Sequence, residues 1–339
     1  MKVAIANDSA IAIEALRRAI LTTRNYELLW IAQTGADAVS CCAKQCPDLL
    51  LMDMHMPNLN GVEATHQIMQ QSPCVILIVT ASITSHSAMV FEAMGYGARD
   101  VVKTPRLGTE NPQAVNILLK KMATLVKYPT VSQNTIQKNS NFSSLQKSGI
   151  KDSYPKLVVI GASTGGPGAL QKILSQLPNK FNAAIVIVQH IDEQFAPGLV
   201  HWLNQSSKLP VIQARNGDRP VVGKVLLAGG NQHLLMRPNG SLRYTHEPAD
   251  YAHRPSVDVF FHSVADYWKQ PGTAILLTGM GKDGALGLGH LCSVKWHTIA
   301  ESETSCIVFG MPKAAIEQGA AQKILTLDQI TSYLLGKIV

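Results

Sequence analysis

Three residue types that together can carry out acyl transfer each follow an apolar segment of the chain. Ser163 lies in the glycine-rich stretch GASTGG, His190 ends the run AAIVIVQH, and Asp283 lies in the glycine turn TGMGKDG. A histidine that is oriented by an acid can activate a serine hydroxyl, which is otherwise a weak nucleophile. Because reactive side chains gather beyond the carboxyl ends of parallel strands, we expect the three to meet at one sheet edge.

The stretch around Ser163 also has an interpretation as a phosphate-binding loop. GASTG fits the pattern G-x-S-x-G, whose glycines permit a tight turn from strand to helix and lift the serine hydroxyl clear of the sheet. A glycine-rich turn at a helix N-terminus suits bound phosphate as well. The stretch lacks the lysine of a Walker loop and breaks the G-x-G-x-x-G register, which argues against a nucleotide site. Taken singly, His190 fits a structural residue and Asp283 a helix N-cap, so the hydrolase interpretation depends on the combination.

Two acids near the N-terminus also end apolar segments. Asp8 follows VAIAN, Asp53 follows LLLM, and the hydroxyl of Thr80 ends the run VILIVT. Carboxylates that meet at one sheet edge suit Mg²⁺, which binds through one or two carboxylates together with water and phosphate. The alternative is that each acid only caps the helix that follows it.

Residues 1 to about 125 alternate between strand and helix patterns. Short apolar runs indicate strands, and the stretches between them have helical periodicity. Five strands with intervening helices predict a parallel sheet that helices cover on both faces. The expected strands are 3–6, 28–32, 48–54, 75–81 and 100–102, and the expected helices are 12–20, 35–45, 61–70, 87–97 and 112–126.

A polar segment separates this half from a second α/β unit. Residues 128–156 are rich in Ser, Asn, Gln, Thr and Lys and poor in apolar periodicity, which indicates a flexible linker. Strand patterns then return at 157–163, 183–190, 224–230, 274–281 and 297–302. We therefore expect a first domain at 1–125, a linker at 126–154, and a doubly wound parallel-sheet domain at 155–339.

The composition argues against several other classes of protein. The chain has 339 residues and a net charge of +7 without a run of Lys and Arg, which favours a solvated basic surface. It lacks both the apolar region of a secretion signal and an apolar stretch of about 18 residues that would span a membrane. None of the six cysteines forms a CxxC pair, which argues against a zinc site. We expect a cytoplasmic protein with no direct membrane insertion.

Residues 2 to about 120 resemble the receiver domain of bacterial two-component response regulators. The stretch LLLMDMHMPNLNGVEA carries the resemblance, together with the strand alternation. The resemblance implies a flavodoxin-like, five-stranded parallel sheet in which Asp53 accepts a phosphoryl group from a histidine kinase. It also implies that Asp8, Asp53 and the backbone carbonyl of His55 hold Mg²⁺, and that Thr80 turns towards the phosphoryl oxygen.

The sequence departs from the receiver pattern at two strand ends. The family usually has two consecutive acids after the first strand, where this chain has Asn7 and Asp8. The family also ends its fifth strand with Lys-Pro, whereas Pro105 here places Thr104 at the lysine position and Lys103 one residue early. A slip of one residue on a strand points the side chain to the other face. Lys103 therefore replaces the missing lysine only if the chain bulges or the side chain curls back.

The second half of the chain resembles the catalytic domain of the chemotaxis-type protein-glutamate methylesterases, which carry a receiver ahead of that domain. The matching motifs are IGASTGGPGAL, VQHI, RPSVDVFF, LLTGMGKDGALGL and CIVFGMPKAA. Ser163 matches the nucleophile of that family, His190 the base and Asp283 the acid. Thr164 and Met280 match the positions that line the oxyanion site.

This resemblance implies an enzyme that hydrolyses glutamate γ-methyl esters on methyl-accepting receptor proteins, releases methanol, and also deamidates receptor glutamines. It implies no cofactor for hydrolysis, Mg²⁺ for phosphorylation of the receiver, and a histidine kinase of the CheA type as the phosphoryl donor. Asp192 stands where the family often has proline after QHI. The stretch FAPG then follows where Phe-Thr is common in the family. With the unusual end of the receiver, these departures resemble the Wsp-type branch, which serves a surface-sensing pathway rather than flagellar chemotaxis.

Three other functions fit parts of the sequence. A DNA-binding response regulator would need a helix-turn-helix output, but the second half has the pattern of a parallel sheet, so we expect no nucleic-acid partner. A non-enzymatic adaptor would not need Ser163, His190 and Asp283 together. A hydrolase of small esters would share this triad and differ only in its substrate.

Overall fold

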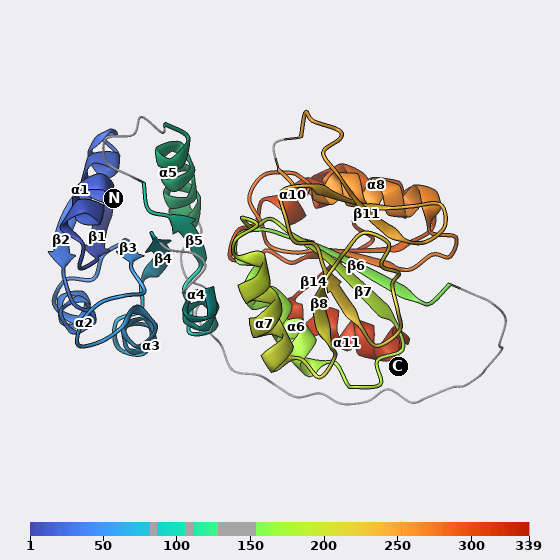
Figure 1. Cartoon of the computed structure of the whole chain (residues 1–339), viewed down its shortest axis with the longest axis horizontal. Coiled ribbons are helices and arrows are strands. Elements are labelled where there is room, and N and C mark those ends of the chain that lie inside the picture. The colour runs from blue at the N-terminus through green and yellow to red at the C-terminus, as the bar shows by residue number, and fades with distance from the viewer. Residues whose placement is uncertain (82–86, 106–111, 128–153, 252, 339) are drawn as a thin grey trace. The chain divides into compact units, whose positions relative to one another are not determined.

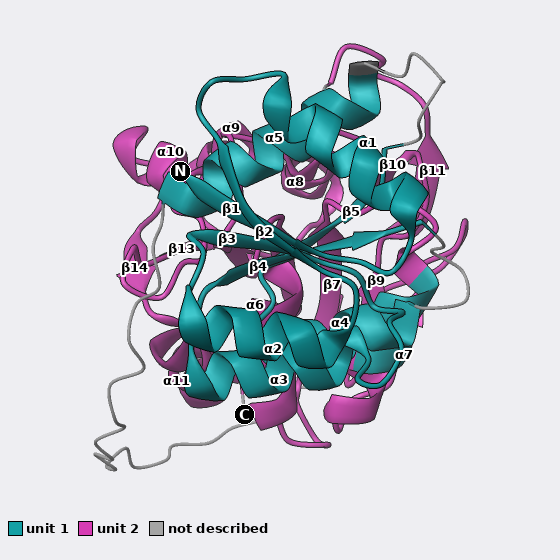
Figure 2. Cartoon of the chain, turned by 90° about the vertical axis from the view of Figure 1, so that its left-hand side faces the viewer, with its two compact units in different colours: residues 1–130, 197–202 teal, residues 131–196, 203–339 magenta. Residues whose placement is uncertain are grey.

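The computed structural model describes residues 1–81, 87–105, 112–127, 154–251 and 253–338 (Figure 1). The chain divides into two compact units, each with its own parallel sheet (Figure 2). Nearly all of the expected linker, 126–154, lies outside the described residues.

The first unit alternates strands and helices in the order that the sequence predicts. Its strands are β1 (Lys2–Ala6), β2 (Glu27–Ala32), β3 (Leu49–Met52), β4 (Val75–Thr80) and β5 (Asp100–Lys103). Its helices are α1 (Ala10–Leu21), α2 (Gly35–Lys44), α3 (Gly61–Gln71), α4 (Ser87–Gly95) and α5 (Pro112–Lys127).

The sheet of the first unit has the strand order β2-β1-β3-β4-β5, and each neighbouring pair is parallel. Helices α1 and α5 cover one face of the sheet, and α2, α3 and α4 cover the other (Figure 2). Because both faces are covered, β3 and β4 are buried along their whole length. This is the flavodoxin-like order that the resemblance to receivers implies.

The second unit is also built from alternating strands and helices. Its strands are β6 (Leu157–Ala162), β7 (Ala184–Gln189), β8 (Val211–Gln213), β9 (Val225–Leu227), β10 (His233–Met236), β11 (Leu242–Thr245), β12 (Thr273–Leu276), β13 (His297–Glu301) and β14 (Lys323–Leu325). Its helices are α6 (Gly166–Gln176), α8 (Val257–Tyr267), α9 (Ala285–Ser293), α10 (Met311–Glu317) and α11 (Leu327–Ile338). Helix α7 (Ala196–Ser206) is divided, since its residues 197–202 are assigned to the first unit and the rest to the second.

The main sheet of the second unit has the order β14-β13-β12-β6-β7-β9-β8, again with parallel neighbours. Helices α8 and α10 lie on one side of it and α6 and α11 on the other, so the unit is doubly wound as predicted (Figure 1). Strands β10 and β11 form a separate antiparallel hairpin. The sequence patterns predict neither this hairpin nor strands β8 and β14, because strands of three or four residues carry little periodic signal.

Strands β12, β6 and β7 are neighbours in the middle of this sheet, and they place the residues of the predicted triad. The backbone N–H of His190 donates to the carbonyl of Ala162 at 2.9 Å, which joins the ends of β7 and β6. On the other side, the N–H of Ser163 donates to the carbonyl of Thr278 at 3.0 Å, which joins the ends of β6 and β12. The residues that follow the three strands are therefore adjacent.

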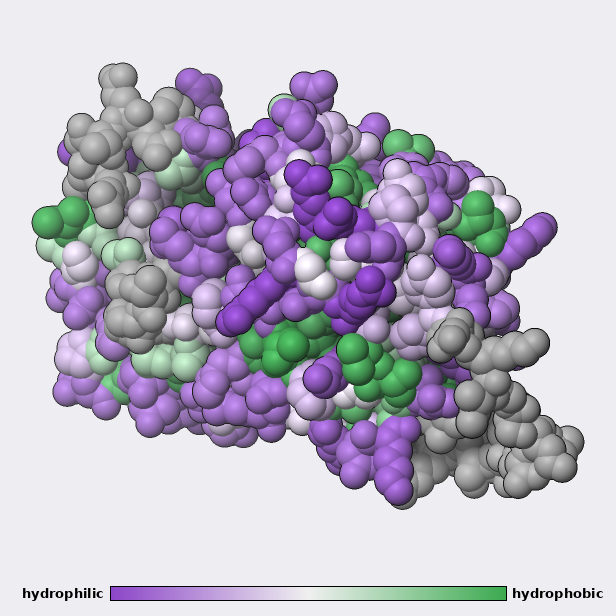
Figure 3. All heavy atoms as spheres, turned by 45° about the vertical axis from the view of Figure 1, so that its right-hand side comes forward, coloured by the Kyte–Doolittle hydropathy of each residue, from purple (hydrophilic) through white to green (hydrophobic). Residues whose placement is uncertain are grey.

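Large apolar side chains, including Trp296, Phe260 and Phe261, are buried in the core of the second unit. The surface drawn in Figure 3 is mainly hydrophilic, with small hydrophobic areas between the polar ones. Among the described residues, no helix combines the length and the apolar character that a membrane span requires.

Candidate active site

Ser163 lies in a sharp turn between β6 and α6. Gly165 adopts a φ of +81°, which side-chain-bearing residues rarely adopt, and a β-carbon there would lie 2.5 Å from Cβ of Ile307. Pro167 then occupies the first turn of α6, where the missing N–H costs no helical hydrogen bond. Ser163 itself is only 9% exposed. The structure therefore contains the strand-to-helix turn that the G-x-S-x-G pattern predicts.

His190 and Asp283 come together from the ends of two different strands. Nε2 of His190 lies 2.7 Å from Oδ2 of Asp283, and both side chains are largely buried. A carboxylate acceptor holds the ring proton on Nε2 in the neutral imidazole. The two residues are 93 positions apart in the chain, and they meet as their positions after apolar segments predict.

Asp283 is held at the N-terminus of α8. Its Oδ2 also accepts the N–H of Val257 at 2.7 Å, and its Oδ1 accepts the Ser256 hydroxyl at 2.8 Å and the N–H of Asp258 at 3.1 Å. Burial alone would raise the pKa of Asp283, but the hydrogen bond and charge of His190 and the bonds from Val257 and Ser256 lower this pKa overall. The carboxylate is therefore ionised, oriented and close to the positive end of a helix.

The other ring nitrogen of His190, Nδ1, carries no proton in this tautomer and can therefore act as a base. Nδ1 is buried, and no described residue hydrogen-bonds to it. Nor is a hydrogen bond present, within the part of the chain that the structure describes, between the ring and the hydroxyl of Ser163. Such catalytic bonds are often long in ligand-free enzymes and tighten when substrate binds.

A second imidazole covers one face of the His190 ring. The rings of His253 and His190 stack with centroids 4.2 Å apart and planes inclined by 15°. The segment that carries His253 is anchored through the fully buried His233, whose Nδ1 accepts the N–H of Ser256 at 3.1 Å and whose Nε2 lies 3.1 Å from the carbonyl of Pro248. His253 is a site residue that the sequence analysis missed, although it directly precedes the motif RPSVDVFF.

The turn after β12 packs directly against Ser163. A β-carbon at Gly279 would lie 2.7 Å from Cβ of Ser163, so only glycine permits this close approach. The hydroxyl of Thr278 donates to the carbonyl of Thr164 at 2.9 Å and accepts the N–H of Val308 at 2.9 Å. The predicted oxyanion residues Thr164 and Met280 thus belong to two turns that Thr278 ties together.

Glu301 is a buried acid behind these turns that the sequence analysis also missed. Its Oε2 accepts the N–H of Thr278 at 2.7 Å, and its Oε1 accepts the hydroxyl of Ser305 at 2.9 Å. Burial raises the pKa of Glu301 to about 7, even though these hydrogen bonds lower it. Glu301 and Thr278 follow the same strand-end pattern as the predicted residues, so a search of every polar residue at a strand end would have found both.

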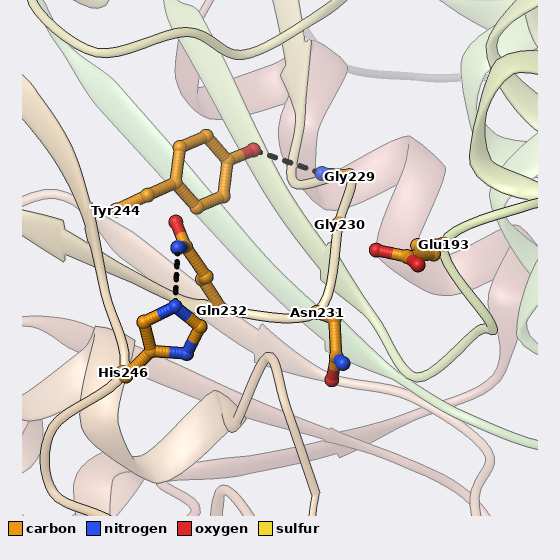
Figure 4. A pocket seen from close by; sticks show the side chains of 7 residues that line it. All are labelled: Glu193, Gly229, Gly230, Asn231, Gln232, Tyr244 and His246. Carbon is orange, nitrogen blue, oxygen red and sulfur yellow. Dashed lines mark hydrogen bonds between the residues drawn. The ribbon is translucent and has the colours of Figure 1, made fainter.

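A polar hollow lies beyond the ends of β7 and β9 at the same edge of the sheet (Figure 4). Its volume is about 360 Å³. The hydroxyl of Tyr244 accepts the N–H of Gly229 at 2.9 Å, and the amide of Gln232 pairs with Nε2 of His246 at 2.7 Å. The other residues that line it are Glu193, Gly230 and Asn231.

The predicted phosphorylation site lies at the ends of β1 and β3 in the first unit. The N–H of Asp53 donates to the carbonyl of Ala6 at 2.9 Å, and its Oδ1 accepts the N–H of Met54 at 2.8 Å. Burial raises the pKa of Asp53 to about 6; the charge of Asp8 also raises it, while amide bonds from Met54 and His55 lower it. Two carboxylates that repel each other at a sheet edge fit a divalent cation such as Mg²⁺.

The end of β5 shows which residue occupies the position at which receivers usually have lysine. Thr80 pairs with Lys103 in the parallel register of β4 and β5, and the N–H of Thr104 donates to the carbonyl of Thr80 at 3.0 Å. Lys103 is exposed, whereas the hydroxyl of Thr104 is buried and no described residue hydrogen-bonds to it. The inward-facing position that the family fills with lysine therefore holds a short, uncharged side chain.

Comparison with known proteins agrees with both halves of this description. Residues 3–110 match the family model described as "Response regulator receiver domain", and residues 158–334 match that described as "CheB methylesterase". The chain is also similar to a crystal structure of the CheB methylesterase catalytic domain of Thermotoga maritima, with a TM-score of 0.51 and 38% identity. That match covers 54% of this chain and 99% of the Thermotoga chain.

Two bacterial proteins named protein-glutamate methylesterase/protein-glutamine glutaminase are similar over nearly the whole chain. The one numbered 3 from Pseudomonas aeruginosa is 48% identical, over 98% of each chain. The one numbered 4 from Burkholderia thailandensis is 46% identical, over 100% of this chain and 98% of its own. With a receiver domain followed by a methylesterase domain and this degree of identity, the chain belongs to the CheB methylesterase family.

Proposed function

We propose that the protein is a protein-glutamate methylesterase that hydrolyses glutamate γ-methyl esters on receptor proteins and releases methanol. The observation that carries the proposal is the contact between His190 and the helix-bound carboxylate of Asp283, beside the turn of Ser163. The names of the relatives support the same activity and also deamidation of receptor glutamines, since both reactions attack the same γ-carbonyl.

In the proposed mechanism, the Ser163 hydroxyl attacks the ester carbonyl while Nδ1 of His190 takes its proton. Asp283 holds the opposite nitrogen and stabilises the imidazolium that forms. Backbone N–H groups at Thr164 and Met280 receive the oxyanion, an interaction worth about 3–4 kcal/mol per donor in other hydrolases. The imidazolium protonates the departing methoxide, and methanol leaves. A water molecule, deprotonated by His190, then hydrolyses the acyl-enzyme and restores the serine.

The same proposal assigns control of the enzyme to the receiver. Residues 1–125 would form the receiver, 126–154 the linker and 155–339 the catalytic domain. A histidine kinase of the CheA type would phosphorylate Asp53, and Thr80 would then turn towards the phosphoryl group. Asp8, Asp53 and the carbonyl of His55 would hold Mg²⁺, which supplies positive charge to the phosphoryl oxygens. The hydrolysis itself uses only side chains and backbone groups of this chain.

We place this reaction on the cytoplasmic side of the membrane, where the cytoplasmic helices of receptors would carry the substrate. Because the sequence around Asp192 resembles that of the Wsp-type branch, receptors of a surface-sensing pathway are the first substrates to test.

The test is methanol release from membranes that contain methylated receptors, with wild-type protein and Ser163→Ala compared. Loss of such a nucleophile lowers kcat by about 10⁶-fold in a well-characterised hydrolase, so we expect release by wild type alone. Equal methanol release by the two proteins, or no release by either folded protein, would contradict the proposed esterase activity. A second comparison adds a phosphoryl donor to wild type and to Asp53→Ala. Activity that the donor does not change in wild type would contradict control by the receiver.

A further inference from the structure

Gln189 is the last residue of β7 and directly precedes His190. Its side chain is buried, with 2% exposed. The carboxamide Nε2 donates to the backbone carbonyl of Ser163 at 2.8 Å and to that of His190 at 3.0 Å. A single side-chain amide therefore binds the backbone of both the proposed nucleophile and the proposed base.

This arrangement leaves the other end of the carboxamide unsatisfied. Oε1 of Gln189 is buried, and none of the described residues donates a hydrogen bond to it. An unpaired buried carbonyl costs about 1–3 kcal/mol, and an apolar side chain of similar length would avoid this cost. Packing alone therefore does not explain a glutamine at this position. The two hydrogen bonds that Nε2 donates are the interactions that an apolar side chain could not make.

The neighbouring helix leaves room for this carboxamide. A β-carbon at Gly166, the first residue of α6, would collide with Oε1 of Gln189. The N–H of Gly166 also donates to the carbonyl of Ser163 at 2.8 Å. The Ser163 carbonyl thus accepts hydrogen bonds both from the start of α6 and from Gln189.

Two bonds to this carbonyl determine the orientation of the peptide group that follows Ser163. A trans peptide is planar, so its C=O and N–H point in opposite directions. The N–H of this peptide belongs to Thr164, which is the proposed oxyanion donor. When the Ser163 carbonyl is held towards Gln189, the Thr164 N–H is held away from it.

We propose that Gln189 is a positioning residue that aims the Thr164 N–H at the oxyanion and keeps the Ser163 turn in register with His190. The inference rests on the proposed function, because it assigns Gln189 a task in that reaction. Gln189 acts through other groups and does not touch the substrate. It therefore affects the rate of the chemical step rather than substrate binding.

The experiment compares Gln189→Met, which keeps the length but removes the donors, with Gln176→Met as a matched control. Gln176 also donates to a backbone carbonyl, that of Lys172 at 3.0 Å, but it is exposed and lies at the opposite end of α6 from Ser163. Methanol release from methylated receptor membranes gives kcat and KM for each variant, and thermal unfolding reports stability. Gly166→Ala, which pushes the carboxamide aside while Gln189 stays, is a second variant in case Gln189→Met does not fold.

We expect Gln189→Met or Gly166→Ala to lower kcat by about 100-fold, the effect of losing one aligned oxyanion donor, with KM within about threefold of wild type. Gln176→Met should match wild type in both constants. A folded Gln189→Met variant that keeps its kcat, or one that changes only KM, would overturn the positioning role. If wild type and Ser163→Ala release methanol equally, the proposed function fails and this role fails with it.

Discussion

Nε2 of His190 lies 2.7 Å from Oδ2 of Asp283, while Nδ1 of the same ring is buried with no hydrogen-bond partner among the described residues. In the Ser-His-Asp arrangement of chymotrypsin-like proteases the acid binds Nδ1, and Nε2 serves the serine. Here the histidine reaches its acid with the nitrogen farther from the backbone. The nitrogen nearer the strand is therefore the one that takes the proton of Ser163 in the proposed mechanism.

The first prediction concerns Asp283→Asn. An amide nitrogen facing His190 would disfavour the proton on Nε2 and place it on Nδ1, where it blocks the base. We expect kcat to fall by about 10⁴-fold, as the equivalent change does in a serine protease. Steady-state methanol release measures the effect. Asp266→Asn, which changes a half-exposed acid on α8, is the control and should retain wild-type kcat.

A residual kcat of Asp283→Asn within about tenfold of wild type would show that the carboxylate does not set the histidine tautomer, since tautomer loss costs about 10⁴-fold.

The second prediction concerns the hydroxyl of Thr278. Thr278→Val keeps the shape but leaves the carbonyl of Thr164 and the N–H of Val308 without this partner. We expect the free energy of unfolding to fall by about 2–4 kcal/mol, because each buried polar group left unsatisfied costs about 1–3 kcal/mol. Thr278→Ser keeps the hydroxyl and should lose less than about half as much. Urea unfolding measures both, and equal loss in the two variants would rule out the hydroxyl as the cause.

The third prediction concerns the pH dependence of stability that Glu301 causes. Its pKa rises from the ordinary 4.5 to about 7 in the folded protein, so the folded state disfavours the carboxylate. The protonated form of Glu301 therefore favours the folded state. This stabilisation is fully present below pH 4.5 and is lost as the pH rises through 7. A rise of this size in pKa corresponds to about 3 kcal/mol.

Glu301→Gln removes this titration. Relative to wild type, its free energy of unfolding should therefore increase by up to about 3 kcal/mol between pH 5 and pH 8. Urea unfolding at several pH values measures the difference, with the exposed Glu303→Gln as control. A difference between Glu301→Gln and wild type that stays constant with pH would show that Glu301 keeps an ordinary pKa.

The fourth prediction concerns the receiver. Thr104→Lys places a cation at the inward-facing end of β5, where a lysine could bind the phosphoryl oxygens. A hydrogen bond to a charged group contributes about 1.5–3 kcal/mol, so we expect about tenfold more phosphorylated Asp53 at a limiting concentration of acetyl phosphate with Mg²⁺. Gel separation of the phosphorylated from the unphosphorylated protein measures this fraction.

Lys103→Met is the matched variant at the exposed neighbouring position. We expect it to leave the phosphorylated fraction close to that of wild type, because the strand directs Lys103 to the other face. A large loss in Lys103→Met together with no gain in Thr104→Lys would mean that Lys103 does the work of the missing lysine.

The five strands of the first unit and five strands of the second were predictable from the sequence, and so were the strand ends at which the candidate catalytic residues lie. Runs such as LLLMD and AAIVIVQH are apolar at every position, because helices cover both faces of a parallel sheet. A polar residue directly after such a run emerges at the carboxyl edge, where active sites of these folds lie. Ser163, His190 and Asp283 could be brought together on this basis, and the family motifs assigned their roles.

Only the tertiary structure decided which atoms meet. The hydroxyl of Thr278 bonds to the backbone carbonyl of Thr164, which is 114 positions away in the chain. The carboxamide of Gln189 bonds to the backbone carbonyl of Ser163, which is 26 positions away. Hydrophobic periodicity reports which face of an element is buried, but not which polar groups face each other across neighbouring strands. Those contacts depend on strand order, register and side-chain rotamer, so the nitrogen with which His190 contacts Asp283 could be identified only from the tertiary structure.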